Sequence, residues 1–483
     1  MPEKLIAIGL DLGTGGARVA AMDFQGHMVA EGRADFPAGA SRVDGAQVEQ
    51  DPFVWTNAAE TALRQLAAGL PADCQIVGLA VDATSGTFLL ADDDGRPLTP
   101  GVMYNDLRAT NEAGRAADAV RPALAPYGIE VAAAFALPKL LWFARHTPDL
   151  FHRCRRMVHQ TDWIVGRLCG RYDVTDVSTA LKSGVEPATL QWPAAIESQL
   201  GIPCRLLPKV VLPGTPIGRL TGDAAAATGL PVGTSIVAGC TDGTAGCLAS
   251  GAKQLGDLNV TLGSTLVFKA ISAQPLLDPA GAVYNHRHPA GGFLPGAAST
   301  TGGEWVGAYL ADENLDALGR RAAGQLPSGH IAYPLVKTGE RFPFACPTAT
   351  GFGLDRITDP GERFAAGMEG VAFLERLGIE RLEQLGLVVG PTVYATGGGV
   401  AGETWLRIRA AVMGRTYCTP RFPQCAVGAA VLAAMPHWGG CGQAVAAIVR
   451  AGQTVEPDPD LAEAYTRPRE QFRAALQERG YVR

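Results

Sequence analysis

Short apolar runs separated by glycine-rich turns make up the start of the chain. Each run is long enough for a strand, and the turns at 13–16 and 25–26 would let neighbouring strands pair. The pattern therefore predicts an antiparallel β-meander. Its three strands are expected at Leu5–Leu12, Ala17–Phe24 and Met28–Asp35.

The pattern then changes to helical spacing. Asp51 and Pro52 suit a helix N-cap and a first helical position, and a helix is expected from there toward Leu66. Ile76–Asp82 is another apolar strand, followed by a hairpin with its tip at 93–95. The stretch 107–215 is richer in helix formers, with amphipathic segments at 137–145 and 161–168.

The later part of the chain repeats the strand–turn–strand pattern of its first residues. Residues 259–270 form an apolar strand, a glycine-hydroxyl turn and a second apolar strand, as residues 8–19 do. The match is short and indicates duplication only weakly. Further on, the pattern predicts a strand and turn over 392–399, a helix over Glu403–Met413 and a charged helix over 460–478. We predict domains at 1–253 and 254–445 and a helical tail at 446–483.

Composition narrows the class of protein. The 483 residues are 47% hydrophobic and 18% charged, which excludes global disorder. The net charge is −6, and without a Lys/Arg block we expect no nucleic-acid partner. No apolar run reaches 18 residues, and the first residues do not resemble a signal peptide, so no membrane partner is expected. Ten cysteines without a CxxC pair favour reduced thiols in a cytoplasmic protein.

Two glycine turns are candidates for phosphate binding. Asp11 ends the first strand, and Gly13, Thr14 and Gly15 follow it, where backbone N–H groups can approach phosphate oxygens. Asp11 could hold a hydrated Mg²⁺ beside them. The alternative is an ordinary β-turn with a solvated aspartate. A second such turn, 261–265, lies in the other half, and two turns can clamp a triphosphate from opposite sides.

A third glycine cluster lies between a strand and a helix. Gly397, Gly399 and Gly402 satisfy GxGxxG, the dinucleotide-binding pattern. No acidic residue follows between Glu403 and Glu456, so the expected ribose partner is missing. A turn beneath an adenosine is the preferred interpretation. Trp405 then either packs near the base or is a core tryptophan.

Asp242 is the candidate for proton transfer. It follows a strand within GlyCysThrAspGlyThrAlaGly (239–246), and no Lys or Arg occurs between Arg219 and Lys253 to pair with it. Such a carboxylate is open to a substrate hydroxyl, although a helix N-cap is the competing interpretation. His286 and His288 lack a third ligand nearby, so surface or hydrogen-bonding histidines are favoured over a metal pair.

Taken in order, these motifs resemble the FGGY family of carbohydrate kinases over roughly 5–440. The resemblance is carried by IGLDLGTGGARV, TDWIVGRLCG, GCTDGTAG, TLGST, ATGGGVAGETW and AVGAAVLAAM. It implies an α/β fold with two ribonuclease-H-like domains, of the sugar kinase, actin and heat-shock chaperone type, around a central cleft. Within the family, residues 82–109 are most similar to D-ribulose kinases related to xylulokinases.

The resemblance also implies an activity: ATP- and Mg²⁺-dependent phosphorylation of the terminal hydroxyl of a pentulose, D-ribulose to D-ribulose 5-phosphate. The alternatives are a kinase for xylulose or another sugar or polyol, and a non-catalytic actin-like ATP-binding protein. A dinucleotide-dependent oxidoreductase would rest only on the turn at 397–402. Closure of the two lobes on substrate is expected, and a homodimer is left open.

By motif, the resemblance assigns each candidate residue a role. Asp242 would be the catalytic base. The sugar would be bound by Asp11, Ser85, Asp106, Arg108 and Asp242, and Mg²⁺ by Asp11, through water. ATP would be bound by Gly13, Thr14, Gly15, Gly263, Ser264, Thr265, Gly397, Gly398 and Trp405. Relatives often carry Asn or Ser where this chain has Gly402, so a polar contact to the nucleotide would be lost there.

Overall fold

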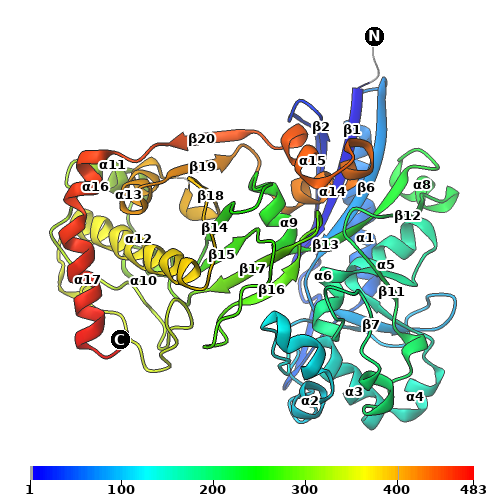
Figure 1. Cartoon of the computed structure of the whole chain (residues 1–483). Helices are drawn as coiled ribbons and strands as arrows, with labels where there is room; N and C mark the ends of the chain where they lie inside the picture. The colour runs from blue at the N-terminus through cyan, green and yellow to red at the C-terminus, as the bar shows by residue number, and fades with distance from the viewer. Residues whose placement is uncertain (1–3, 401, 483) are drawn as a thin grey trace. The chain divides into compact units, whose positions relative to one another are not determined.

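The computed structural model describes residues 4–400 and 402–482, which form two compact units (Figure 1). The first unit contains the described residues up to Ala249, together with His286–Gly291 and Gln424–Arg450. The second contains Ser250–Asn285, Gly292–Pro423 and the described residues from Ala451 onward. Each unit therefore draws on segments that are distant in the sequence.

A six-stranded mixed sheet is the centre of the first unit. Its order is β12-β13-β6-β1-β2-β3, with β1, β6 and β13 parallel and the remaining pairs antiparallel. The predicted meander is thus confirmed as β1 to β3. The strands are β1 (Lys4–Leu12), β2 (Gly16–Asp23), β3 (Met28–Asp35), β6 (Cys74–Ala83), β12 (Pro216–Arg219) and β13 (Ser235–Thr241).

Smaller sheets and helices complete the first unit. One sheet joins β4 (Ser41–Asp44), β5 (Gln47–Gln50), β8 (Gly101–Val102), β7 (Phe88–Ala91) and β9 (Arg156–His159), and another joins β10 (Val174–Asp176) to β11 (Lys209–Val211). The helices are α1 (Pro52–Ala68), α2 (Ala113–Leu124), α3 (Ala136–His146), α4 (Pro148–Arg153), α5 (Gln160–Cys169), α6 (Val177–Ala180), α7 (Ala195–Ser198), α8 (Gly222–Thr228), α9 (Asp242–Ala249), α14 (Cys425–Trp438) and α15 (Cys441–Ile448). Helix α1 begins as predicted, because Asp51 caps it by accepting from the Phe53 N–H.

Helix α14 packs on the main sheet of the first unit, although it follows most of the second unit in sequence. The contact is close because small residues line both sides. A Cβ atom on Gly9 of β1 would lie 1.8 Å from the Ala426 carbonyl oxygen, and one on Gly428 of α14 would lie 1.9 Å from that of Ala245 in α9. These two glycines are therefore required by the approach of backbone to backbone.

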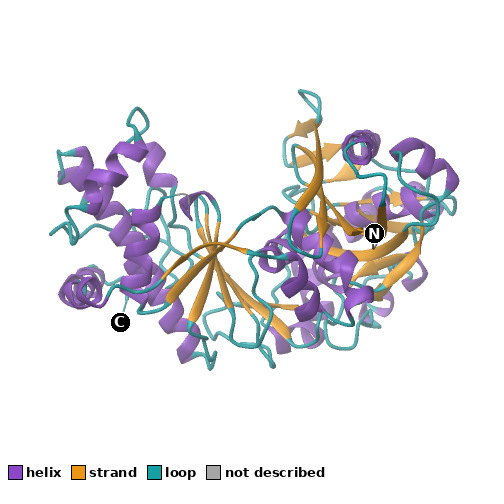
Figure 2. Ribbon diagram, turned by 90° about the horizontal axis from the view of Figure 1, so that it is seen from above, coloured by secondary structure: helices purple, strands orange, loops and turns teal. Residues whose placement is uncertain are grey.

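The second unit repeats the same sheet plan. Its order is β16-β17-β15-β14-β18-β19-β20, with β14, β18 and β19 parallel and their outer neighbours antiparallel. Figure 2 shows these strands as a twisted fan with helices beside it. The strands are β14 (Leu258–Leu262), β15 (Leu266–Ala270), β16 (Tyr284–Arg287), β17 (Phe293–Ala298), β18 (Thr392–Thr396), β19 (Thr416–Pro420) and β20 (Ala451–Val455).

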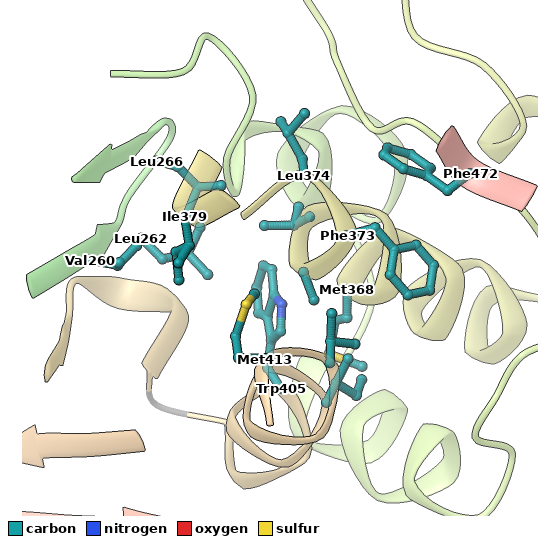
Figure 3. Packing of buried hydrophobic residues seen from close by; sticks show 14 of the residues in the cluster. Val260, Leu262, Leu266, Met368, Phe373, Leu374, Ile379, Trp405, Met413 and Phe472 are labelled. Carbon is teal, nitrogen blue, oxygen red and sulfur yellow. The ribbon is translucent and has the colours of Figure 1, made fainter. Parts of the chain in front are cut away.

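The core of the second unit is apolar and rich in aromatic side chains. Met368 and Phe373 of the long helix α12 and Trp405 of α13 lie in it, and Phe373 contacts Phe472 of α17 (Figure 3). Trp305 contacts Trp405 with ring centroids 6.1 Å apart. The helices are α10 (Glu304–Tyr309), α11 (Leu315–Ala323), α12 (Pro360–Gln384), α13 (Glu403–Met413), α16 (Pro459–Ala464) and α17 (Thr466–Glu478), with a 3₁₀ turn η5 (Gly398–Val400).

One element prediction is wrong. The single helix expected over 460–478 is two helices that are separated at Tyr465. Pro468 explains the break, because its ring would clash with the carbonyl four residues earlier, that of Ala464, where α16 ends.

Candidate active site

Three aspartates lie at the carboxyl ends of the three parallel strands in the first unit. Asp11 on β1 pairs in register with Asp82 on β6, and Asp82 pairs in register with Cys240 on β13. Asp242 follows β13 directly, as the first residue of α9. Because carboxyl ends of parallel strands share one edge of a sheet, the fold brings these three residues together.

Two of the carboxyl groups contact each other. The Asp82 side chain is fully buried, and among the described residues no conventional donor reaches either of its oxygens. Burial, followed by the charges of Asp11 and Asp242, raises the pKa of Asp82 well above its ordinary value. Burial also raises the pKa of Asp11, although its interaction with the Asp82 carboxyl group and the charge of Arg18 oppose that rise. The two carboxyl groups are therefore suited to share one proton.

Asp242 differs from these two because its side chain is exposed. One of its carboxylate oxygens accepts from the Gly243 N–H at 2.6 Å. The preceding Thr241 N–H donates to the Ser178 hydroxyl at 3.1 Å, and Ser178 in turn donates to Asp176, which is buried. The strand end is thus fixed while the carboxylate stays accessible.

The first glycine turn is open to solvent beside Asp11. Thr14 and Gly15 are exposed, and the turn is closed by a hydrogen bond from the Gly13 N–H to the Gly16 carbonyl at 3.0 Å. A Cβ atom on Gly13 would meet nothing nearer than 3.9 Å, and one on Gly15 would meet nothing within 4 Å. Internal packing therefore does not require glycine here, so the turn leaves room for a ligand.

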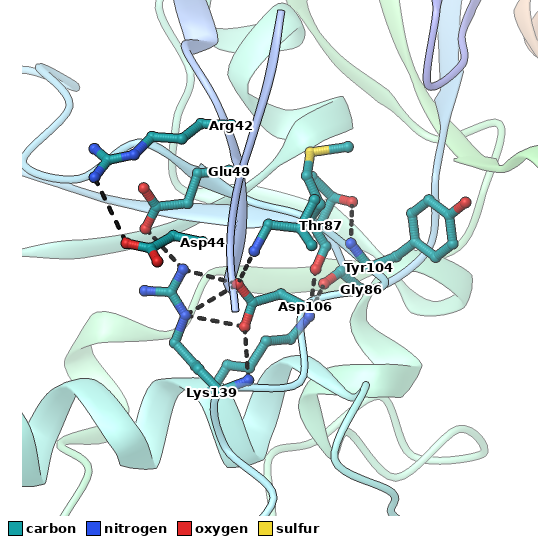
Figure 4. Close-up of polar contacts among 11 residues, drawn as sticks. Arg42, Asp44, Glu49, Gly86, Thr87, Tyr104, Asp106 and Lys139 are labelled. Atoms are coloured by element: carbon teal, nitrogen blue, oxygen red, sulfur yellow. Dashed lines mark hydrogen bonds and ion pairs between the residues drawn. The ribbon is translucent and has the colours of Figure 1, made fainter. Parts of the chain in front are cut away.

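Asp106 and Arg108, both predicted to bind sugar, are bound to each other (Figure 4). The Arg108 guanidinium donates to both Asp106 oxygens and to Glu49, and it lies over the Trp142 ring. Asp106 is fully buried and also accepts from the Val48 N–H at 2.6 Å. Among the described residues, these two side chains therefore bind protein groups. That they also bind sugar stays a prediction.

Lys139 connects the two segments predicted to bind sugar. Its buried ammonium donates to the Gly86 carbonyl at 3.1 Å and to the Met103 carbonyl at 2.8 Å (Figure 4). Burial lowers the pKa of Lys139 to about 7, against the opposing charge of Asp106. Ser85 lies beside this contact, and its hydroxyl oxygen is buried without a hydrogen-bond partner in the described part of the chain.

The second unit contains a large pocket of about 790 Å³, a volume suited to a nucleotide. Its lining includes Gly263 and Ser264 of the β14–β15 turn and residues of η5 and helices α10, α11, α12 and α13. Phe364, Met368 and Trp405 supply apolar side chains. The pocket thus combines a glycine-hydroxyl turn with an apolar recess.

The glycines of the 397–402 cluster have two different roles. Gly397 has a φ of +90°, and a Cβ there would lie 2.4 Å from the Leu262 carbonyl oxygen. A Cβ on Gly399 would meet the Leu262 side chain at 2.2 Å. Gly398 and Gly402 line the pocket and have open space around them. Gly398 is therefore the better placed of the two predicted glycines to face a nucleotide, and Gly397 shapes the turn.

Trp405 combines the two roles considered for it. It is 6% exposed within the core cluster, and it also lines the pocket (Figure 3). The dinucleotide interpretation of this cluster loses further support, because β14 and β15 of the same sheet are antiparallel and the strand order is not that of a Rossmann fold.

The histidine pair is buried rather than at the surface, so of the two alternatives the structure supports hydrogen-bonding histidines. His286 is 5% and His288 is 1% exposed, and His288 accepts from the Ala290 N–H at 3.1 Å. Burial lowers the pKa of His288 to about 4. In the described part of the chain, no group of three His, Cys, Asp or Glu side chains could hold a metal ion directly.

Models of known families match most of the chain. The N-terminal domain of the FGGY family of carbohydrate kinases matches residues 6–249, and its C-terminal domain matches residues 258–437. The chain belongs to the FGGY family of carbohydrate kinases. The resemblance inferred from the motifs is thereby confirmed, as are the two-domain α/β fold and the activity of an ATP-dependent sugar kinase.

Individual FGGY kinases are similar at low identity over nearly the whole chain. Xylulose kinase of Escherichia coli is 27% identical over 420 residues, covering 84% of this chain and 85% of that protein. Autoinducer-2 kinase of Salmonella choleraesuis is 25% identical, covering 98% and 94%. The crystal structure of xylulose kinase from Rhodospirillum rubrum has a TM-score of 0.84 at 27% identity, covering 98% of each chain.

Several residues near the site have no assigned role in the sequence interpretation. Lys139 was part of an amphipathic helix pattern, and no feature of that pattern marks its ammonium as buried. Asp176 and Ser178 lie in a helix-rich stretch, and only the tertiary contact with Thr241 identifies them. Asp82 had a local signal, because it ends an apolar strand as Asp11 does.

Proposed function

We propose that this FGGY kinase transfers the γ-phosphoryl group of ATP to the terminal hydroxyl of a pentulose, forming D-ribulose 5-phosphate from D-ribulose. The observation that supports a sugar site in the first unit is the exposed carboxylate of Asp242 beside the buried pair Asp11 and Asp82. The choice of D-ribulose rests on the resemblance of residues 82–109 to D-ribulose kinases.

In this proposal Asp242 is the catalytic base. Its carboxylate accepts the proton of the 5-hydroxyl as that oxygen bonds to the γ-phosphorus. The bond between the γ-phosphorus and the bridging oxygen of ADP breaks in the same step, and ADP leaves. Its exposure supports this role, since a base must come within hydrogen-bond reach of the proton it accepts.

Nucleotide binding is proposed for the pocket of the second unit. Gly263, Ser264 and Thr265 would bind phosphate, and Gly398 and Trp405 would lie beside the adenosine. The absence of side chains at Gly398 and Gly402 supports the fit of a flat base there. Gly13, Thr14 and Gly15 would approach the transferred phosphate from the first unit.

Mg²⁺ is proposed at Asp11, through water. The arrangement fits a hydrated ion, because Mg²⁺ retains several waters and is held by few protein carboxylates, and the described residues offer no set of three direct ligands. Bound Mg²⁺ would neutralise phosphate charge. The residues of this chain would orient the hydroxyl and accept its proton.

The function is tested by measuring ADP release with D-ribulose, D-xylulose, ribitol, arabinitol, glycerol, gluconate and autoinducer-2 as acceptors. We expect D-ribulose to have the highest kcat/KM. If D-xylulose has the highest kcat/KM, the proposed substrate is wrong but the pentulose class stands. Xylulose is the sugar in the names of the xylulose kinase relatives. Preference for glycerol or another polyol would overturn the pentulose proposal.

The cellular location proposed is the cytoplasm. The ten cysteines all lie in the described part of the chain and form no disulfide there, as expected in a reducing compartment. Among the described residues no helix has the length and apolar character needed to cross a membrane.

A further inference from the structure

A buried carboxylate outside the nucleotide pocket accepts three of its hydrogen bonds from one loop. Glu340 is 3% exposed. Its carboxylate accepts from the Ser299 hydroxyl at 3.0 Å, the Thr300 N–H at 2.5 Å and the Thr301 hydroxyl at 2.8 Å. The Tyr333 hydroxyl donates to it at 2.8 Å. Three consecutive residues are therefore fixed by one side chain.

This loop, Ser299–Gly303, lies directly on the β14–β15 turn. The Leu266 N–H donates to the Thr301 carbonyl at 2.9 Å, and the Gly303 N–H donates to the Gly263 carbonyl at 2.7 Å. The contact has no spare room, since a Cβ on Gly302 would lie 2.4 Å from the Cα of Thr265. The loop and the turn therefore form one rigid wall, and Gly263, Ser264 and Gly303 of that wall line the pocket.

We propose that Glu340 is a positioning residue for phosphoryl transfer. By fixing Ser299–Gly303 it holds the Gly263–Thr265 turn in the shape that binds the phosphates of ATP. Backbone N–H groups stabilise phosphate only when they are already aimed at it, so a turn at the tip of a hairpin needs such external support. This inference rests on the phosphate-binding role proposed for the turn.

The same unit offers a matched control in Glu369 of α12. Glu369 is 1% exposed and accepts from the Ser328 N–H at 2.9 Å, the Ser328 hydroxyl at 2.5 Å and the Tyr465 hydroxyl at 3.0 Å. Its donors are thus a backbone N–H, an aliphatic hydroxyl and a tyrosine, as they are for Glu340. Neither Glu369 nor its partners line the pocket.

The test compares Glu340→Gln with Glu369→Gln in the full-length enzyme, using the best sugar of the acceptor screen. Each change weakens the hydrogen bonds that a buried carboxyl group accepts, so both variants should have a lower melting temperature. Only Glu340→Gln should raise the KM for ATP, by about tenfold for a loss equivalent to one such bond. Its KM for sugar should stay near that of the wild type. Equal KM values for ATP in the two variants would overturn the proposal.

Two further variants keep the outcome decisive. If Glu340→Gln does not fold, Thr301→Val removes one hydrogen bond of the network and should also raise the KM for ATP, whereas an unchanged KM would count against positioning. Gly263→Ala tests the turn itself, because a Cβ there would meet no protein atom nearer than 3.9 Å and would only crowd a phosphate. An unchanged KM for ATP in Gly263→Ala would refute the phosphate role of the turn. If Gly263→Ala raises the KM for ATP and Glu340→Gln does not, the positioning role of Glu340 is refuted and the phosphate role of the turn stands.

Discussion

At the scale of single residues, the environment divides three aspartates into different roles. Asp82 is buried with a raised pKa, Asp11 contacts it at the edge of the open turn, and Asp242 is exposed. Burial makes Asp82 harder to ionise and keeps it away from a substrate, whereas the exposed carboxylate of Asp242 is accessible to a substrate hydroxyl. Asp242 is therefore the group expected to accept the proton.

Changing Asp242 to Asn tests this assignment. The amide keeps the shape of the side chain and removes its basicity. We expect turnover to fall by about 10²-fold or more, the lower part of the range for a positioned general base. Titration of the protein with ATP alone should give a dissociation constant near that of the wild type, because the nucleotide is proposed to be held by other segments.

The matched control is Asp82→Asn, which changes a neighbouring carboxyl group of the same kind. It should keep more turnover than Asp242→Asn. Nearly full activity of Asp242→Asn would show that Asp242 serves only as the first residue of α9, and the base would then be sought at Asp11 or Asp82.

Lys139 gives a prediction about pH. Burial lowers the pKa of its ammonium to about 7, Asp106 opposes this, and Lys182 and Arg108 add to it. In the unfolded chain a lysine holds its proton up to about pH 10.4, so between these values the unfolded state binds more protons than the folded state. Stability should therefore rise with pH in this window, by up to ~1.4 kcal/mol per unit from this residue.

Replacing Lys139 with Met should remove that rise. The measurement is the free energy of unfolding of both proteins at pH 7, 8 and 9, and the difference between them should grow with pH. Lys209→Met, at an exposed lysine of the same unit, should leave the slope unchanged. A constant difference between wild type and Lys139→Met would mean that Lys139 keeps its proton in the folded state.

At the scale of elements, local patterns identified the strands β1, β2, β3, β6, β14, β15 and β18 and the starts of helices α1 and α13. Alternating apolar runs with glycine turns are sufficient for β1 to β3, and Asp51 with Pro52 is sufficient for α1. The strand order that the two sheets share could not be derived from the sequence pattern, because the pattern repeats only between residues 8–19 and 259–270. The repeat is visible in register: Asp11 opposes Asp82 in one sheet, and Thr261 opposes Thr396 in the other.

The site was predictable to a similar extent. The prediction that Asp242 and both glycine turns follow strands is confirmed, whereas their roles in the site stay predictions. Contacts between distant segments were not predictable: the Arg108–Glu49 ion pair and the Glu340 loop contacts depend on tertiary packing. The predicted domain boundaries followed the chain in order, whereas Gln424–Arg450 belongs to the first unit.

The packing of α14 against α9 gives a stability prediction. Gly428→Ala would place a methyl group 1.9 Å from the Ala245 carbonyl oxygen, so backbone must move. We expect a loss of about 1–3 kcal/mol, typical of overpacking, seen as a lower melting temperature. Because α9 begins at Asp242, turnover should fall as well.

Gly246→Ala, on α9 at the same interface, is the control. Its new Cβ would meet only the Cys425 sulfur, at 3.7 Å, which is an ordinary contact. The higher helix propensity of alanine should leave stability unchanged or raise it by up to about 1 kcal/mol. Equal losses in the two variants would contradict the close approach at Gly428.

At the scale of the whole molecule, the proposed chemistry needs groups from both units. The proposed base is in the first unit and the nucleotide pocket is in the second. We expect sugar and a non-hydrolysable ATP analogue together to reduce the radius of gyration, since water must be kept from the γ-phosphate. Small-angle scattering with each ligand alone and with both measures this. An unchanged radius with both bound would exclude closure.

Helix α14 belongs to the first unit but is translated late, which has a consequence for folding during protein synthesis. The ribosome releases β1 and β6 early, but the helix that covers Gly9 and Gly78 emerges only after most of the second unit has been made. Until then the apolar face of the first sheet has no native cover, and such faces promote aggregation. A nascent chain would therefore carry all six strands of its first sheet, which are complete at Thr241, long before the helix that covers them. A fragment ending near residue 250 would depend on α14 supplied as a separate piece.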